Sequence, residues 1–249
     1  MAKEYKGKTS LTYFLIFLCI AIYLLEVYYQ KTYGEDFINN VFENFGFSLQ
    51  NVLGGKLWVF ATSIFLHAGL DHLVLNMLAL FFFGRVVERN VGEGKFLITF
   101  FISGIGGNLL LMASSFIGLS SATIPTIGAS AAIFGLMGTA MLIKPFELMF
   151  YPYLIPIPLI LAAVFYTLYN VATFLMVLSG DLTSSISYVS HIGGLIAGML
   201  LGFGEEGSGK GLIALIFILI LLVATPFVMM IFEYLQVFNY IEVISNFFK

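Results

Sequence analysis

The stretch GASAAIFGLMG at residues 128–138 decides how the rest of this chain is interpreted. It is dense in glycine and alanine, and it predicts a helix from Ser130 to Ile143 that ends before Pro145. At 1.5 Å per residue this helix is about 21 Å long, whereas the hydrocarbon core of a bilayer is ~30 Å thick. The helix is therefore too short to cross a membrane.

The composition places this short helix in a membrane protein. Of the 249 residues, 60% are hydrophobic and 10% are charged, and the mean hydropathy is +1.00. A soluble domain carries about 25% charged residues. A half-length helix in a bilayer begins at depth, where its exposed backbone end must face protein or a water-filled cavity. Ser130, at that buried end, is therefore a candidate functional residue.

The same composition excludes several other classes of protein. The net charge is −3 and there is no basic stripe or tail, so no nucleic-acid partner is expected. Cys19 is the single cysteine and forms no intrachain disulfide. No spacing of histidine, cysteine and carboxylate residues predicts a metal site, and no motif predicts a cofactor.

Hydropathy predicts an all-α fold, a polytopic bundle of transmembrane helices in a single membrane domain over residues 1–249. No internal repeat is apparent, which weighs against an inverted-repeat transporter. Residues 30–66 are too apolar for a free loop and too rich in glycine for a span. They are therefore predicted to form an interfacial, partly re-entrant segment that lies at the level of the lipid headgroups. The predicted apolar helices are 11–29, 70–87, 96–119, 130–143, 159–178, 191–203 (starting a few residues earlier) and 212–232.

The distribution of lysine and arginine predicts the orientation of these helices. With the N-terminus in the cytoplasm, basic residues concentrate on the inner side, as the positive-inside rule requires. The inner residues are Lys3, Lys6, Lys8, Arg85, Arg89, Lys95, Lys144 and Lys210, and the outer ones are Lys31, Lys56 and Lys249. The C-terminus is then outside. His72, Ser130 and His191 all lie near the outer ends of helices that run inward.

Three polar side chains in the predicted spans need an explanation, since such groups are costly in lipid. His72 and Asn76 are four residues apart and share a helix face. They could simply hold the bundle together by an interhelical hydrogen bond. His67, at the end of the connector, is predicted to be an ordinary interfacial histidine. His191 opens the run HIGGLIAG at residues 191–198.

Two helix faces of small residues predict that His191 meets Ser130. Gly194 and Gly198 lie on the face of His191, and the short helix offers Ala131, Gly135 and Gly138 at matching spacing. Small residues let two helices approach closely. If these faces pack, the two helix starts come together.

A histidine beside a serine at depth predicts nucleophilic catalysis. The hydroxyl of Ser130 needs an adjacent base, and a neutral imidazole at His191 can take its proton and later pass it to a leaving amine. The Ser130 backbone N–H, Asn76 and His72 are candidate donors to the developing oxyanion. Asp71 and Asp181 lie at loop or helix-edge positions, so a Ser–His dyad is the simpler prediction.

These residues resemble the rhomboid family of intramembrane serine proteases. The resemblance rests on the spacing of His67, His72 and Asn76 at the start of the second span, on Gly128-Ala-Ser130, and on His191 with Gly194 and Gly198. It covers most of residues 55–205. It implies a rhomboid-like six-helix core, about 1–205, with an extra C-terminal transmembrane helix at about 211–235. It also implies a membrane-embedded first connector, a mobile fifth span beside the access route for substrate, and a structural carboxylate at Glu88.

The same resemblance implies that Ser130 is the nucleophile and His191 the general base. Asn76 and His72 would contribute to the oxyanion hole. The substrates would be transmembrane segments of other proteins, cleaved near the outer leaflet, with no cofactor and with the cell membrane as the location.

Three positions depart from the family pattern. Ala131 replaces the last glycine of Gly-x-Ser-Gly, Phe134 stands where tyrosine is common, and Val59 follows Trp58 where many members have arginine. The phenyl ring at Phe134 can still stack on the base. The alternative function is that of a catalytically silent relative that binds membrane clients. A third possible function is that of a transporter or cofactor-binding bundle, but the sequence has no paired-histidine pattern for haem.

Overall fold

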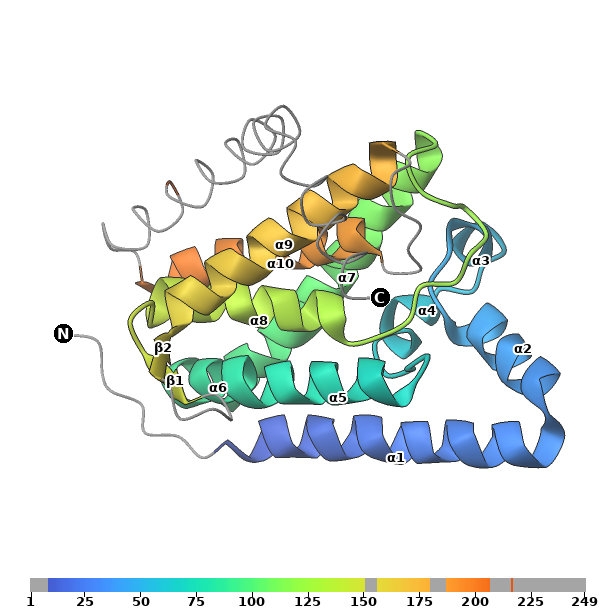
Figure 1. The fold of residues 1–249 in the computed structure, drawn as a ribbon, viewed down its shortest axis with the longest axis horizontal. Coiled ribbons are helices and arrows are strands. Elements are labelled where there is room, and N and C mark those ends of the chain that lie inside the picture. The colour runs from blue at the N-terminus through green and yellow to red at the C-terminus, as the bar shows by residue number, and fades with distance from the viewer. Residues whose placement is uncertain (1–8, 151–155, 180–186, 207–215, 217–249) are drawn as a thin grey trace, which may run out of the picture.

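The chain folds as a helical bundle with one short β-hairpin (Figure 1). The computed structural model describes residues 9–150, 156–179, 187–206 and 216. The elements are α1 (Ser10–Tyr33), α2 (Glu35–Phe45), α3 (Leu49–Leu53), α4 (Val59–Thr62), α5 (Leu70–Ala79), the π-helix η1 (Leu80–Gly84), α6 (Arg85–Val91), α7 (Glu93–Phe116), α8 (Ser130–Ile143), β1 (Leu148–Phe150), β2 (Pro156–Pro158), α9 (Leu159–Ser179) and α10 (Tyr188–Glu206).

The short helix has the bounds that the sequence predicts, Ser130–Ile143. Within the described residues, three helical segments are long and apolar enough to cross a membrane: Ser10–Tyr33, Leu70–Val91 and Glu93–Phe116. The predicted last span at 212–232 lies outside the described residues, apart from Ile216. The first six predicted segments are therefore helical in the structure, with ends shifted by a few residues.

One end of α1 is held by a buried carboxylate. Glu88 of α6 is fully buried and accepts hydrogen bonds from the backbone N–H groups of Leu11 and Thr12, at 2.9 and 2.8 Å, and from the Thr12 hydroxyl at 2.6 Å. The first N–H groups of a helix have no partner inside it, so a carboxylate there satisfies them. The expectation that Glu88 is a structural carboxylate at a helix end is confirmed.

The second span is not a regular helix. Between α5 and α6 the backbone passes through the π-helix η1, a rare geometry that inserts extra backbone into a helix. Its last residue, Gly84, packs against Thr12 of α1, where a Cβ would lie 3.0 Å from the Thr12 methyl. Hydropathy gave no sign of this irregularity.

The connector after α1 contains three short helices, α2 to α4. Trp58 donates its indole N–H to the backbone oxygen of Asn44 at 3.0 Å. Val59 is fully buried in a small apolar cluster with Phe47, Leu111 and Val189. Val59, which stands where many family members have arginine, therefore helps to fix the connector to α7 and α10 by apolar packing.

The core consists of α7, α8 and α10, packed through small residues. A Cβ on Gly194 would lie 2.0 Å from the Ala131 carbonyl oxygen, and one on Gly198 would lie 1.9 Å from that of Gly135. Thr139 also donates its hydroxyl to the Gly198 carbonyl at 2.6 Å. The predicted close approach of the two small faces is confirmed, and α8 is buried from Ala131 to Ile143.

The α7 helix completes this core with glycines of its own. A Cβ on Gly107 would lie 2.6 Å from the Ala131 methyl and 2.5 Å from the Ser190 carbonyl oxygen. The glycine at 107 therefore provides the room that the extra methyl of Ala131 needs.

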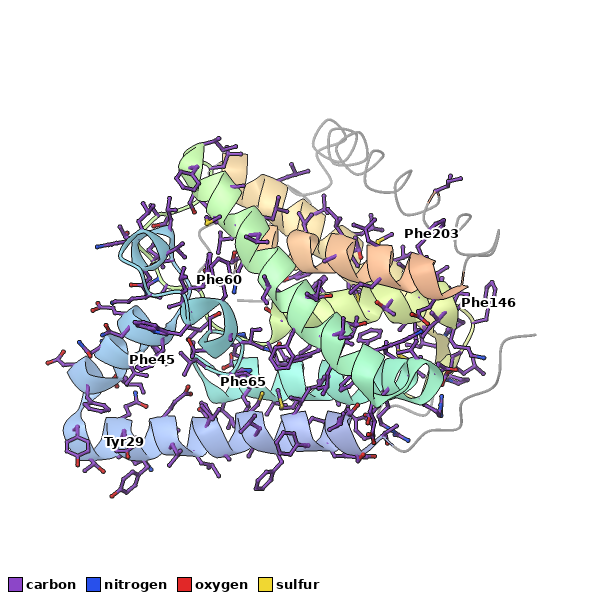
Figure 2. The ribbon with its side chains drawn as sticks, turned by 180° about the vertical axis from the view of Figure 1, so that it is seen from behind. Tyr29, Phe45, Phe60, Phe65, Phe146 and Phe203 are labelled. Carbon is purple, nitrogen blue, oxygen red and sulfur yellow. The ribbon has the colours of Figure 1, made fainter. Side chains whose placement is uncertain are left out.

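Large apolar side chains cover the outside of the bundle. Tyr29 and Phe45 lie toward one end, whereas Phe146, which is 75% exposed, and Phe203 lie toward the other (Figure 2). Aromatic residues concentrate at the two interfaces of membrane proteins. Such a surface suits a bilayer, and the protein is an integral membrane protein.

Candidate active site

Ser130 and His191 meet where α8 and α10 begin. The Ser130 hydroxyl oxygen lies 2.7 Å from His191 Nε2. Ser130 is the first residue of α8, and His191 lies in the first turn of α10, which starts at Tyr188. The close packing of these helices brings the two side chains together, as the paired small faces predict.

A ring stack holds the imidazole in place. The rings of Phe134 and His191 lie 4.5 Å apart between centroids at an angle of 12°. Phe134 is four residues after Ser130 and so lies on the same face of α8. The predicted stacking at this departure from the family pattern is confirmed.

His72 and Asn76 border the backbone just before Ser130. A Cβ on Gly128 would lie 2.7 Å from His72 Nε2 and 3.9 Å from Asn76 Nδ2. Gly128 has φ of +122°, which glycine alone adopts readily. One Asn76 N–H is donated to the His72 carbonyl at 2.9 Å, and the amide carries a second N–H. The glycine lets both side chains approach the start of α8.

His67 lies in the loop before α5, outside the spanning helices. It is buried, and its ring centroid is 5.2 Å from that of His72. Burial and the neighbouring His72 lower the pKa of His67 to about 4. The side chain is therefore neutral near pH 7, and it is a buried residue rather than the interfacial one that its position in the sequence suggests.

One side chain at the site was not predicted from the sequence. Asn170 of α9 places its Oδ1 2.7 Å from His191 Nδ1. Asp71 is exposed, and Asp181 lies outside the described residues. The feature of the sequence that could have identified Asn170 is its amide in an otherwise apolar span, since a polar side chain there usually faces the interior of the bundle.

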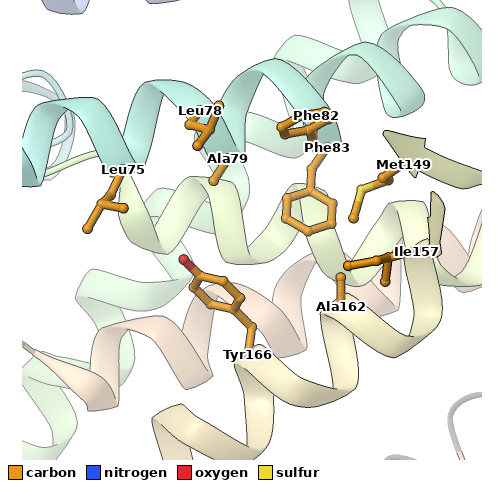
Figure 3. A pocket seen from close by; sticks show the side chains of 9 residues that line it. All are labelled: Leu75, Leu78, Ala79, Phe82, Phe83, Met149, Ile157, Ala162 and Tyr166. Carbon is orange, nitrogen blue, oxygen red and sulfur yellow. The ribbon is translucent and has the colours of Figure 1, made fainter. Parts of the chain in front are cut away.

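An apolar pocket of about 60 Å³ lies beside the site, between α5, η1, the hairpin and α9 (Figure 3). Leu75, Phe83 and Tyr166 are among its lining residues. The ring of Tyr166 also contacts Phe134, with centroids 6.0 Å apart. Two aromatic rings, Tyr166 and Phe134, therefore lie between this pocket and His191.

This arrangement contains the parts that acyl transfer needs. A neutral imidazole can accept a proton from the hydroxyl 2.7 Å away. The first backbone N–H groups of α8 have no carbonyl partner in the helix and can stabilise negative charge. Among the described residues no group of three metal-ligating side chains occurs.

Comparison with known proteins decides the family. A sequence model of the rhomboid domain matches residues 54–206, more than half of the chain. The chain belongs to the rhomboid family. The matched range contains every side chain of the site described above, including Asn170.

Named rhomboid proteases resemble the chain over much of its length. The rhomboid protease GluP of Bacillus subtilis (strain 168) is 31% identical over 224 residues, which are 87% of this chain and 40% of GluP. The rhomboid protease AarA of Providencia stuartii is 31% identical over 206 residues, 78% of this chain and 72% of AarA. The mitochondrial RHOMBOID-like protein 12 of Arabidopsis thaliana is 29% identical over 177 residues, 66% of this chain and 50% of that protein. The chain spans less than two thirds of the first and third of these rhomboid relatives.

Proposed function

We propose that the protein is an intramembrane serine endopeptidase in which Ser130 is the nucleophile and His191 the general base. The observation that carries the proposal is the 2.7 Å contact between the Ser130 hydroxyl and His191 Nε2 at the start of the short helix α8. A hydroxyl becomes a useful nucleophile only beside a base. After acylation the same imidazole would protonate the departing amine.

Asn76 and His72 are proposed to stabilise the oxyanion, together with the Ser130 backbone N–H. Both side chains border Gly128, two residues before the nucleophile. Donors in a site without bulk water stabilise developing charge far more strongly than donors in water. The helix dipole of α8 adds positive potential at the same place.

The proposed substrates are transmembrane segments of other proteins. A peptide bond must leave its helix to be attacked, so cleavage is expected at small or helix-destabilising residues. The apolar pocket between α5 and α9 supports an approach from that side, because it would accept apolar side chains two aromatic rings away from His191.

The proposed location is the cell membrane, with the N-terminus in the cytoplasm and the C-terminus outside. Cleavage would then occur in the outer half of the bilayer. The proposed organisation is a rhomboid core at about 1–205, followed by one more transmembrane helix at about 211–235.

Cleavage of a single-span substrate by purified protein in detergent tests the proposal. Ser130→Ala and His191→Ala are each expected to lower kcat by roughly 10⁶-fold, the loss seen when a serine protease loses nucleophile or base. Ser121→Ala is the matched control, because Ser121 is exposed in the loop before α8 and its hydroxyl bonds only to residues of that loop. It should cleave as the wild type does.

Persistent cleavage by folded Ser130→Ala protein would contradict the proposal. A serine-directed fluorophosphonate should label the wild type at Ser130 and leave Ser130→Ala unlabelled. Absence of both labelling and cleavage in the wild type would instead favour the catalytically silent relative that binds membrane clients.

A further inference from the structure

A third side chain, Asn170 of α9, completes the hydrogen-bonded chain that begins at Ser130. Asn170 Oδ1 lies 2.7 Å from His191 Nδ1, and His191 Nε2 lies 2.7 Å from the Ser130 hydroxyl. Asn170 is 3% exposed and His191 9% exposed. Little water can compete for these bonds, so the protein itself decides where the imidazole proton resides.

The backbone at Tyr188 orients the Asn170 amide. Asn170 Nδ2 donates to the Tyr188 carbonyl at 3.1 Å. The reverse orientation would place the amide oxygen against that carbonyl, so that two acceptors would face each other. The carbonyl of α10 therefore directs Oδ1 toward His191.

This orientation determines the tautomer of His191. An amide oxygen only accepts hydrogen bonds, so His191 Nδ1 must donate. A neutral imidazole carries one N–H, which leaves Nε2 with a lone pair pointing at the Ser130 hydroxyl. This is the tautomer that a general base for Ser130 requires.

We infer that Asn170 is a positioning residue that holds His191 in the Nδ1–H tautomer and aims Nε2 at Ser130. The inference rests on the proposed function, and it replaces the predicted dyad by a Ser130–His191–Asn170 chain. A neutral amide suits this buried position, because an ionised carboxylate there would carry a large cost of desolvation. Asn170 touches the base but not the nucleophile.

Two variants at residue 170 and one control test this role. Asn170→Leu keeps the approximate size of the side chain and removes the acceptor. Asn170→Asp keeps an oxygen facing Nδ1. Thr167→Val is the control: Thr167 is buried one turn earlier on α9, and its hydroxyl bonds only to Ala163 of the same helix. Both kcat and KM are measured on a single-span substrate in detergent, beside wild type and Ser130→Ala.

Asn170→Leu is expected to lower kcat roughly 100-fold, as small misplacements of catalytic groups do, with KM unchanged. Asn170→Asp should recover part of the loss, because its carboxyl in the neutral, protonated form can accept from His191 Nδ1 and donate its O–H to the Tyr188 carbonyl. Thr167→Val should behave as the wild type. Equal kcat in Asn170→Leu and wild type would overturn the inference. Equal losses in Asn170→Leu and Thr167→Val would also overturn it, since the effect would then be one of packing.

The tautomer itself provides a readout that needs no variant. The ¹⁵N spectrum of His191 in the wild type should show the proton on Nδ1, and a proton on Nε2 would overturn the inference even if Asn170→Leu failed to fold. If the wild type and Ser130→Ala cleaved equally well, the proposed function would fail. Comparison of the ¹⁵N spectra of the wild type and Asn170→Leu would still decide whether Asn170 sets the tautomer.

Discussion

At the scale of single residues, Gly128 shows how one missing side chain shapes the site. Its φ of +122° and the closeness of His72 both depend on the absence of a Cβ. The backbone there leads directly into Ser130, so a change at Gly128 would alter the nucleophile and the proposed oxyanion donors together. Phe134 acts in the same neighbourhood by stacking on His191.

Gly128→Ala is therefore expected to lower kcat by about 100-fold. The methyl group would displace His72, and removing one oxyanion donor costs about 10²–10³ in kcat. Backbone strain at a positive φ adds roughly 1–3 kcal/mol to the cost of folding. Steady-state cleavage and thermal unfolding in detergent measure the two effects.

Gly118→Ala separates strain from displacement. Gly118 also has a positive φ, of +76°, but a Cβ there would meet nothing within 4 Å. This variant should lose stability and keep the kcat of the wild type. A wild-type kcat in Gly128→Ala would show that His72 tolerates the methyl group.

At the scale of elements, the close packing of α8 and α10 creates the contact between Ser130 and His191. In lipid, helices associate through close backbone approach rather than through the hydrophobic effect. The glycines of α10 lie directly against carbonyl groups of α8, so the two helix starts are placed with little freedom. Asn170 adds a link from α9, and any displacement of α9 would remove the partner of His191 Nδ1.

Gly198→Ala is expected to destabilise the protein by about 1–3 kcal/mol, the usual cost of overpacking a well-packed interface. Its methyl group would lie 1.9 Å from the Gly135 carbonyl oxygen, so the helices must separate. Unfolding in mixed detergent micelles measures the free energy of unfolding, and cleavage should fall in parallel.

Gly204→Ala is the matched control on the same helix. A Cβ at Gly204 meets nothing within 4 Å, and alanine favours a helix over glycine by ~1 kcal/mol. This variant should be as stable as the wild type or more stable. A similar loss in both variants would mean that helix propensity, and not packing against α8, governs the response.

At the scale of the whole molecule, the two ion pairs among the described residues lie at one end of the bundle. Arg89 pairs with Glu147, and Lys95 pairs with Glu205 at 2.6 Å. Figure 1 shows α6, the β-hairpin and the start of α1 at this end, whereas α8 begins away from it, partway along the bundle. The proposed orientation puts the end with the two ion pairs in the cytoplasm and Ser130 in the outer half of the membrane.

Two reporter fusions test this orientation. A phosphatase that is active only outside the cytoplasm should be active when fused after Lys249 and inactive when fused after Glu206. The predicted span at 212–232 carries the chain across between the two points. Activity at both points, or at neither, would contradict that span, and the reversed pattern would contradict the orientation.

Features that depend on neighbours along the chain could be predicted from the amino-acid sequence. Hydropathy located the spans, helix length against bilayer thickness singled out Ser130, and the spacing of small residues identified the faces that pack. Each is a local property, because it depends only on the order and size of consecutive side chains. Together they were sufficient to predict that His191 lies beside Ser130.

Contacts between distant segments, in contrast, became visible in the folded bundle. Asn170 at His191 and Gly107 at Ala131 each join residues on different helices, and the π-helix η1 arises within this packing. A linear pattern shows that an amide or a glycine is present, but not which atom it will meet. That depends on the rotation and crossing of whole helices, which the packing of the complete bundle determines.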